Sequence, residues 1–70
     1  MPRISGAAAV RAFEKAGWVF ARQTGSHVIL YREGVDITLS IPRHRELSPG
    51  LLQDQIKKAG LTVDEFIALL

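Results

Sequence analysis

The sequence predicts an α+β fold in which helices cover one face of a three-stranded antiparallel sheet. An alanine-rich segment with helical spacing opens the chain, and three segments with alternating apolar residues follow it. Two apolar segments with helix-capping residues come last. The expected order is therefore α-β-β-β-α plus a short C-terminal helix. A length of 70 residues leaves room for one domain, which we expect to span residues 1–70.

The first helix is expected over residues 5–16. Ser5 is suited to cap its N-terminus, and apolar residues such as Phe13 follow at helical spacing. Several alanines add helix propensity. Gly17 suits a left-handed C-terminal cap, which places Trp18 to fold back onto the helix.

Three strands are expected over residues 18–23, 27–31 and 35–41, separated by two glycine-containing turns. The third segment has the clearest alternation in the chain, and Pro42 ends it because proline cannot donate a ladder hydrogen bond.

The alternation assigns the strand side chains to two faces. One set is expected to face the helices: Trp18, Phe20, Val28, Leu30, Ile37, Leu39 and Ile41, with Arg22 on the same side of its strand as Trp18 and Phe20. A second, mixed set is expected on the opposite face: His27, Ile29, Tyr31, Asp36, Thr38 and Ser40. That second face is polar enough to meet water and apolar enough to meet a partner.

The remaining helices carry clear end signals. Ser48 and Pro49 begin one helix and Gly60 closes it. Thr62 and Glu65 form a capping box for the last one. Its apolar residues either pack onto the core, which we favour, or face another chain: Phe66, Ile67, Leu69 and Leu70.

Composition excludes several classes of protein. The chain has no cysteine, which excludes disulfides, thiolate metal sites and cysteine nucleophiles and favours a cytoplasmic location. No apolar stretch approaches the roughly 20 residues of a membrane-spanning helix. An apolar content of 47% excludes a disordered tail. Residues 1–35 carry five basic and two acidic side chains, and this local excess of positive charge suggests a polyanionic partner.

His27 is the first candidate for chemistry. It follows Gly25 and Ser26 at the start of the second expected strand, where a side chain is accessible. Histidine exchanges protons near neutral pH, so His27 could accept a proton from a ribose 2′-hydroxyl or give one to a leaving oxygen. From position alone, an ordinary surface histidine stays an open alternative.

His44 is the second candidate, because Arg43 and Arg45 flank it directly after Pro42. Guanidinium groups bind phosphate oxygens in a bidentate way, although a solvated loop explains the same three residues. No metal site is expected, since neither histidine has a second histidine at ligand spacing or a carboxylate cluster beside it.

The segment Arg22-Gln23-Thr24-Gly25-Ser26-His27 resembles the HicA family of bacterial toxins, which are small mRNA interferases. The likeness extends over nearly the whole chain and includes further segments: Ser5-Gly6, Glu14-Lys15-Ala16-Gly17-Trp18, Ile41-Pro42-Arg43-His44, Gly50 and Ala59-Gly60-Leu61-Thr62. Two positions depart from the family's pattern. Ala7 stands where a lysine is common, and Gln55 stands where an apolar residue is common.

The resemblance implies a double-stranded-RNA-binding-domain-like fold and cleavage of mRNA without a metal or other cofactor, with His27 as the catalytic residue. It also implies that a HicB-type antitoxin binds the toxin and masks His27. We expect substrate contacts from six residues around that histidine: Arg22, Gly25, Ser26, Arg43, His44 and Arg45.

Two other functions compete with this hypothesis. The same surface could serve a non-catalytic RNA-binding or antitoxin-binding module. The low net charge of +2 and the apolar C-terminus also fit a structural subunit without activity of its own.

Overall fold

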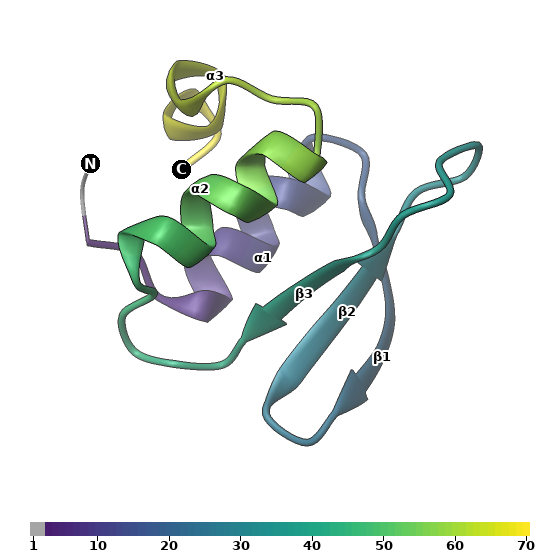
Figure 1. Cartoon of the computed structure of the whole chain (residues 1–70), viewed down its shortest axis with the longest axis horizontal. Helices are drawn as coiled ribbons and strands as arrows, with labels where there is room; N and C mark the ends of the chain where they lie inside the picture. Colours follow the sequence, from purple (N-terminus) through teal and green to yellow (C-terminus); the bar gives the residue numbers. More distant parts are fainter. Residues whose placement is uncertain (1–2) are drawn as a thin grey trace.

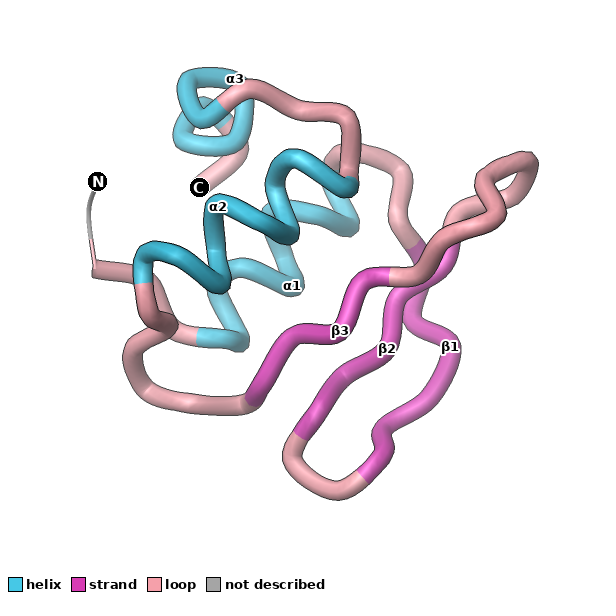
Figure 2. Tube along the Cα trace, in the orientation of Figure 1, coloured by secondary structure: helices cyan, strands magenta, loops and turns pink. Residues whose placement is uncertain are grey.

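The structure is a computed structural model that describes residues 3–70, and its element order is the predicted one (Figure 1). The helices and strands follow one another along the chain, as Figure 2 shows: α1 (Gly6–Lys15), β1 (Val19–Thr24), β2 (His27–Tyr31), β3 (Leu39–Pro42), α2 (Pro49–Lys58) and α3 (Val63–Ala68). This arrangement confirms the α+β class and is consistent with a double-stranded-RNA-binding-domain-like fold. In the described chain, no helix is long and apolar enough to cross a membrane.

The three strands form one antiparallel sheet with the spatial order β1-β2-β3. Helices α1 and α2 both pack against β3, and the helices lie on one side of the sheet (Figure 1). The other face of the sheet is left open by residues 3–70. Alternate residues of β2 are accordingly buried and more exposed.

The predicted helix caps are confirmed. The hydroxyl oxygens of Ser5 and Ser48 each accept a hydrogen bond from the backbone N–H three residues later, at 3.1 and 3.4 Å. The Thr62 hydroxyl and the Glu65 carboxylate form the two reciprocal hydrogen bonds of a capping box, at 3.1 and 2.8 Å. Each cap satisfies backbone N–H groups that have no partner within their helix.

One hydrophobic core joins the helices to the inner face of the sheet. At its centre the rings of Phe13 and Phe66 lie 5.0 Å apart between centroids and are tilted by 46°, a separation typical of interacting aromatic pairs. Trp18 folds back as predicted, with its backbone N–H donating to the Phe13 carbonyl oxygen at 3.1 Å. The buried apolar residues come from every element except β1: Ile4, Ala9, Ala12, Phe13, Trp18, Val28, Leu30, Leu39, Ile41, Leu47, Leu52, Ile56 and Phe66.

The third strand is shorter than its alternating pattern predicts. It begins at Leu39, and residues 35–38 lie in a connection that extends beyond the helices (Figure 1). Strand β2 ends at Tyr31, and the chain then turns through a hydrogen bond from the Val35 N–H to the Arg32 carbonyl oxygen. Residues 35–38 therefore have no partner strand. The expectation that Ile37 faces the helices is wrong, because its side chain is 44% exposed.

Phe20 has the predicted face of its strand but is not part of the core. Its pairing with Leu30 puts it on the helix-facing side of the sheet, but it is 49% exposed. Phe20 is exposed because it lies in β1, and the helices pack against β3 at the opposite edge of the sheet. All six residues of β1 are exposed.

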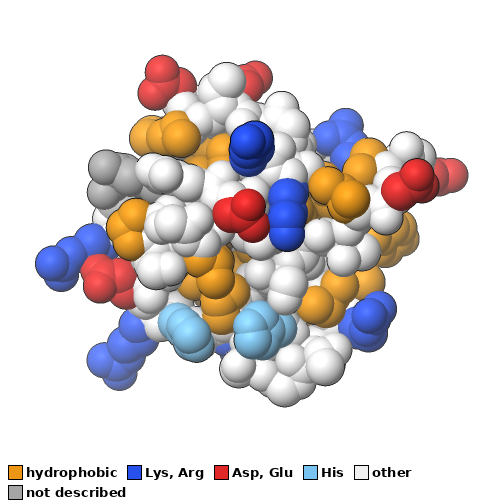
Figure 3. Space-filling view, in the orientation of Figure 1, with side chains coloured by type: hydrophobic (Ala, Val, Ile, Leu, Met, Phe, Trp, Pro, Cys, Tyr) orange, Lys and Arg blue, Asp and Glu red, His pale blue; other side chains and the backbone are white. Residues whose placement is uncertain are grey.

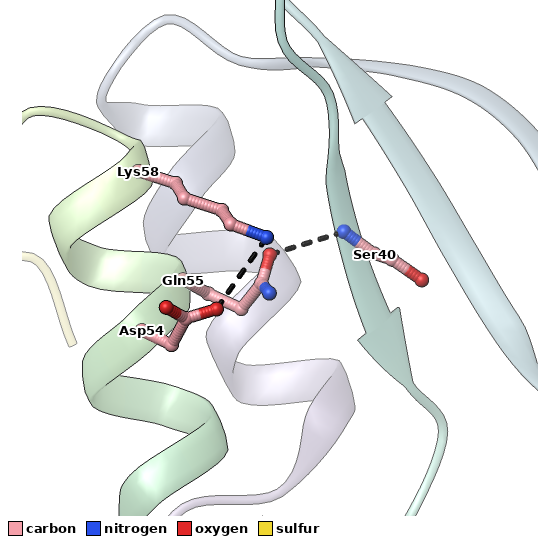
Figure 4. Close-up of polar contacts among 4 residues, drawn as sticks. All are labelled: Ser40, Asp54, Gln55 and Lys58. Carbon is pink, nitrogen blue, oxygen red and sulfur yellow. Dashed lines mark hydrogen bonds and ion pairs between the residues drawn. The ribbon is translucent and has the colours of Figure 1, made fainter.

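Gln55 is a polar residue at a buried position of α2, and a hydrogen bond compensates for its burial. Its side chain is almost fully buried, and its amide oxygen accepts a hydrogen bond from the backbone N–H of Ser40 at 3.1 Å (Figure 4). Asp54 and Lys58 form an ion pair at 3.4 Å next to it on the same helix. The glutamine thus links α2 to the edge strand β3.

Two of the four C-terminal apolar residues pack onto the core and two are exposed. Phe66 is fully buried and Leu69 packs against the core, as the core hypothesis predicts. Ile67 and Leu70 are exposed, so half of the stripe does not contribute to the core.

Candidate functional site

His27 is the first residue of β2 and its side chain is exposed. It pairs with Thr24 in β1 and with Pro42 in β3, so it lies in the last row of the sheet beside the β1–β2 turn. Gly25 in that turn has a φ of 59°, a conformation that residues with a side chain rarely adopt. The turn therefore brings the chain sharply back and leaves the imidazole accessible at the end of the sheet.

The register assigns further side chains to the open face with His27. Residues directly opposite one another in antiparallel strands share a face, so the row of Arg22, Ile29 and Ser40 lies on the same side as His27. This corrects the predicted placement of Arg22 beside Phe20. A β-bulge between Phe20 and Arg22 adds one residue to β1, and the extra residue turns Arg22 to the open face.

Three hydrogen bonds fix the turn that precedes His27. The backbone N–H of Arg43 donates to the Ser26 carbonyl oxygen at 2.7 Å. The Gln23 side-chain amide donates to the Gly25 carbonyl oxygen at 3.1 Å and accepts from the Arg43 guanidinium at 3.2 Å. The structure thus brings together Gly25, Ser26 and Arg43 of the predicted site.

Gln23 belongs to this cluster although the sequence does not predict it as a site residue. It lies beside Arg22 in the sequence, but the alternation of β1 gives no sign that its amide joins two separate segments. The only sequence signal was its position in the Arg-Gln pair of the family resemblance. Its two hydrogen bonds hold the start of the loop after β3 against the β1–β2 turn.

His44 and Arg45 are held less firmly. The backbone of His44 is anchored, since its carbonyl oxygen accepts the N–H of Gly6 at 2.9 Å. Both side chains are exposed, and within residues 3–70 no hydrogen bond or ion pair holds either of them. Figure 3 shows both histidines of the chain on one face, near its lower edge.

The arginines of the predicted site are free of carboxylate partners in the described chain. The two ion pairs among residues 3–70 lie elsewhere, between Arg3 and Glu46 and between Asp54 and Lys58. The guanidinium groups of Arg22, Arg43 and Arg45 therefore have unused donors for an anionic ligand. Among the same residues, no group of three or more histidine, aspartate or glutamate side chains is arranged to hold a metal ion.

Comparison with known proteins connects this surface to a family. Comparison with curated proteins gives no match. A family model described as the HicA toxin of bacterial toxin–antitoxin systems matches residues 6–61. The match spans α1, the whole sheet and α2, and it includes every residue of the candidate site. The chain therefore belongs to the HicA toxin family.

Proposed function

We propose that this HicA-family toxin is an endoribonuclease that cleaves mRNA in the cytoplasm with His27 as its catalytic residue. The observation that carries the proposal is the position of His27 at the end of the open sheet face, beside a turn fixed by Gln23 and Arg43. The imidazole is exposed beside an anchored turn, and the guanidinium groups around it have no carboxylate partner among residues 3–70. This arrangement can bind a phosphodiester of a single strand.

The reaction uses the substrate's own 2′-hydroxyl and needs no metal. The 2′-oxygen loses its proton and attacks the neighbouring phosphorus, and the bond from phosphorus to the 5′-oxygen breaks. His27 takes the proton from the 2′-hydroxyl or gives one to the leaving 5′-oxygen. Arg22, which shares the open face, and Arg43 contact the phosphate oxygens, with Arg45 and His44 as auxiliary contacts from the adjoining loop. Gly25 and Ser26 shape the turn against which the strand lies.

The test compares purified wild type with His27→Ala and His44→Ala on a labelled RNA. We expect His27→Ala to reduce the cleavage rate by about 10²–10⁴-fold, the usual contribution of a general acid or base. His44→Ala, which removes the other histidine and only an auxiliary contact, should lower the rate far less. A substrate with deoxyribose at the cleaved position should stay intact because it lacks the nucleophile. Equal cleavage by wild type and His27→Ala would exclude the proposal.

We further propose that a HicB-type antitoxin neutralises the toxin by covering the open face. Val19 and Tyr31 pair directly on that face and are 46% and 44% exposed, an apolar surface at the end of the sheet away from His27. A partner protein that spans the face from this pair to His27 would mask the histidine.

The same apolar pair favours the second candidate, a module that binds RNA or antitoxin without cleaving. That function predicts salt-dependent RNA affinity, no product and no effect of His27→Ala. The cleavage assay above separates the two functions directly.

A further inference from the structure

A groove lies between the first half of α1 and the helix-facing side of the β1–β2 hairpin, on the other side of the sheet from His27. Its volume is about 330 Å³ and its principal lining residues are Ala7, Val10, Arg11, Gln23, Val28 and Arg43. Small-ligand pockets start at about 300 Å³, so this groove suits a group of nucleotide size. The beginning of α1 and the β1–β2 turn both lie in the lower part of Figure 1.

The walls of the groove are aliphatic. Ala7 is exposed, Val10 is half-buried, and Val28 comes from the inner face of β2. A flat ring with π-faces can cover such surface and remove it from water. An ion alone would leave it wet.

Gln23 gives the groove a fixed pair of polar atoms. A glutamine amide offers two N–H donors and two acceptor lone pairs. One donor is used on the Gly25 carbonyl and one lone pair on the Arg43 guanidinium, which fixes the orientation of the amide. One donor and one acceptor remain, and this adjacent pair matches the hydrogen-bonding edge of an unpaired base.

The charge of the groove is positive. Arg11 and Arg43 both line it, no carboxylate residue does, and neither arginine takes part in the ion pairs of residues 3–70. A nucleotide is a ligand that combines a flat ring with π-faces, a hydrogen-bonding edge and an attached anion.

Two residues that line the groove adjoin the predicted site. Val28 directly follows His27, and Arg43 both lines the groove and holds the Ser26 carbonyl at the turn before His27. We propose that the groove is a nucleotide subsite that takes the base next to the cleaved phosphate. Gln23 hydrogen-bonds the base edge, and Arg11 and Arg43 contact the flanking phosphates. The inference rests on the proposed function, since it assigns this base to the RNA that His27 cuts.

Titration of the ¹⁵N-labelled protein tests the subsite without relying on cleavage. The probes are the four ribonucleoside 5′-monophosphates, ribose 5-phosphate as the base-free control, and N-acetyl-leucine amide as an apolar peptide mimic. We expect the nucleotides to shift the signals of Val10, Val28 and the Gln23 side chain, with half-saturation at about tenfold lower concentration than ribose 5-phosphate. Ala7→Phe fills the groove and should abolish these shifts, whereas Ala68→Phe on exposed α3 should leave them unchanged.

Four results would overturn the subsite. Equal affinity for nucleotides and ribose 5-phosphate would leave only an anion site. Shifts from the leucine amide but not from nucleotides would assign the groove to a protein partner. Unchanged nucleotide binding in Ala7→Phe would place the ligand elsewhere. Cleavage of RNA by the same wild-type sample is measured in parallel. Nucleotide shifts without cleavage would refute the proposed function and leave a nucleotide-binding groove, whereas cleavage without any nucleotide shift, the fourth result, would refute the subsite alone.

Discussion

The side-chain amide of Gln55 in α2 caps the backbone N–H of Ser40 in β3, at 3.1 Å between donor and acceptor. Strand β3 is an edge of the sheet, and edge strands expose unpaired backbone groups that can recruit another strand. The amide oxygen satisfies one of these groups from a buried position. The polar residue at this site therefore closes part of an edge that an aliphatic side chain would leave open.

Replacing Gln55 with leucine should destabilise the protein although it adds an apolar residue to a buried site. The Ser40 N–H loses its acceptor, and a partly buried donor without a partner costs about 1–3 kcal/mol. Urea denaturation followed by the fluorescence of Trp18, the single tryptophan, measures the free energy of unfolding. Gln53→Leu makes the same change at an exposed position of the same helix and should stay within about 0.5 kcal/mol of wild type. Equal stabilities of the two variants would contradict this role.

The fold was largely predictable because its local signals agree with one another. The caps at Ser5, Ser48 and Thr62 and the inward residues of β2 all appear where the sequence places them. These features depend on neighbouring residues, which a sequence displays directly.

The errors have causes that are not local. Phe20 follows the correct alternation, but α1 and α2 pack against β3 at the other edge of the sheet and do not cover it. Ile37 is exposed because residues 35–38 lie in the connection before β3 and not in a strand. The extra residue of the β-bulge likewise reverses Arg22 without any local sign. In the candidate site, the motifs predict His27 and Arg43, whereas the amide of Gln23 joins segments that only the folded chain brings together.

Gly6→Ala should be destabilising, although alanine usually strengthens a helix. A Cβ at Gly6 would overlap the carbonyl oxygen of Pro42 and lie 3.2 Å from the Arg43 Cα, both of them backbone atoms that cannot turn aside. Overpacking of this kind costs about 1–3 kcal/mol. Gly50 offers the matched control, because it lies in the first turn of α2 with open space around its Cβ position. Gly50→Ala should stabilise the protein by about 0.4–1 kcal/mol. Thermal unfolding measures both variants, and we expect a lower midpoint temperature for Gly6→Ala and a higher one for Gly50→Ala. A stabilising Gly6→Ala would refute the close approach.

Gln23→Ala should lower cleavage activity far more than stability. The variant loses the hydrogen bonds to Arg43 and to the Gly25 carbonyl, both on exposed groups whose net contribution to folding is small. Displacing the turn by a fraction of an ångström moves His27 from the phosphodiester, and errors near 1 Å cost about 100-fold in rate. We expect kcat to fall by about tenfold or more while the urea midpoint stays close to that of wild type. Gln53→Ala controls for the loss of an amide from the surface. Wild-type kcat in Gln23→Ala would show that the turn holds its position without this residue.

Phe66→Ala should come close to unfolding the protein, even though the family match ends at residue 61 and α3 lies beyond it. The Phe66 ring is fully buried and packs at a tilt against the ring of Phe13 in α1, so α3 completes a core that the other elements leave open. Truncating a buried phenylalanine to alanine costs about 3–5 kcal/mol, a large part of the roughly 5–15 kcal/mol that stabilises a typical domain. Ile67→Ala removes an exposed side chain of the same helix and should cost much less, in the same denaturation assay. If the two variants unfold at the same urea concentration, α3 is an appendage and not part of the core.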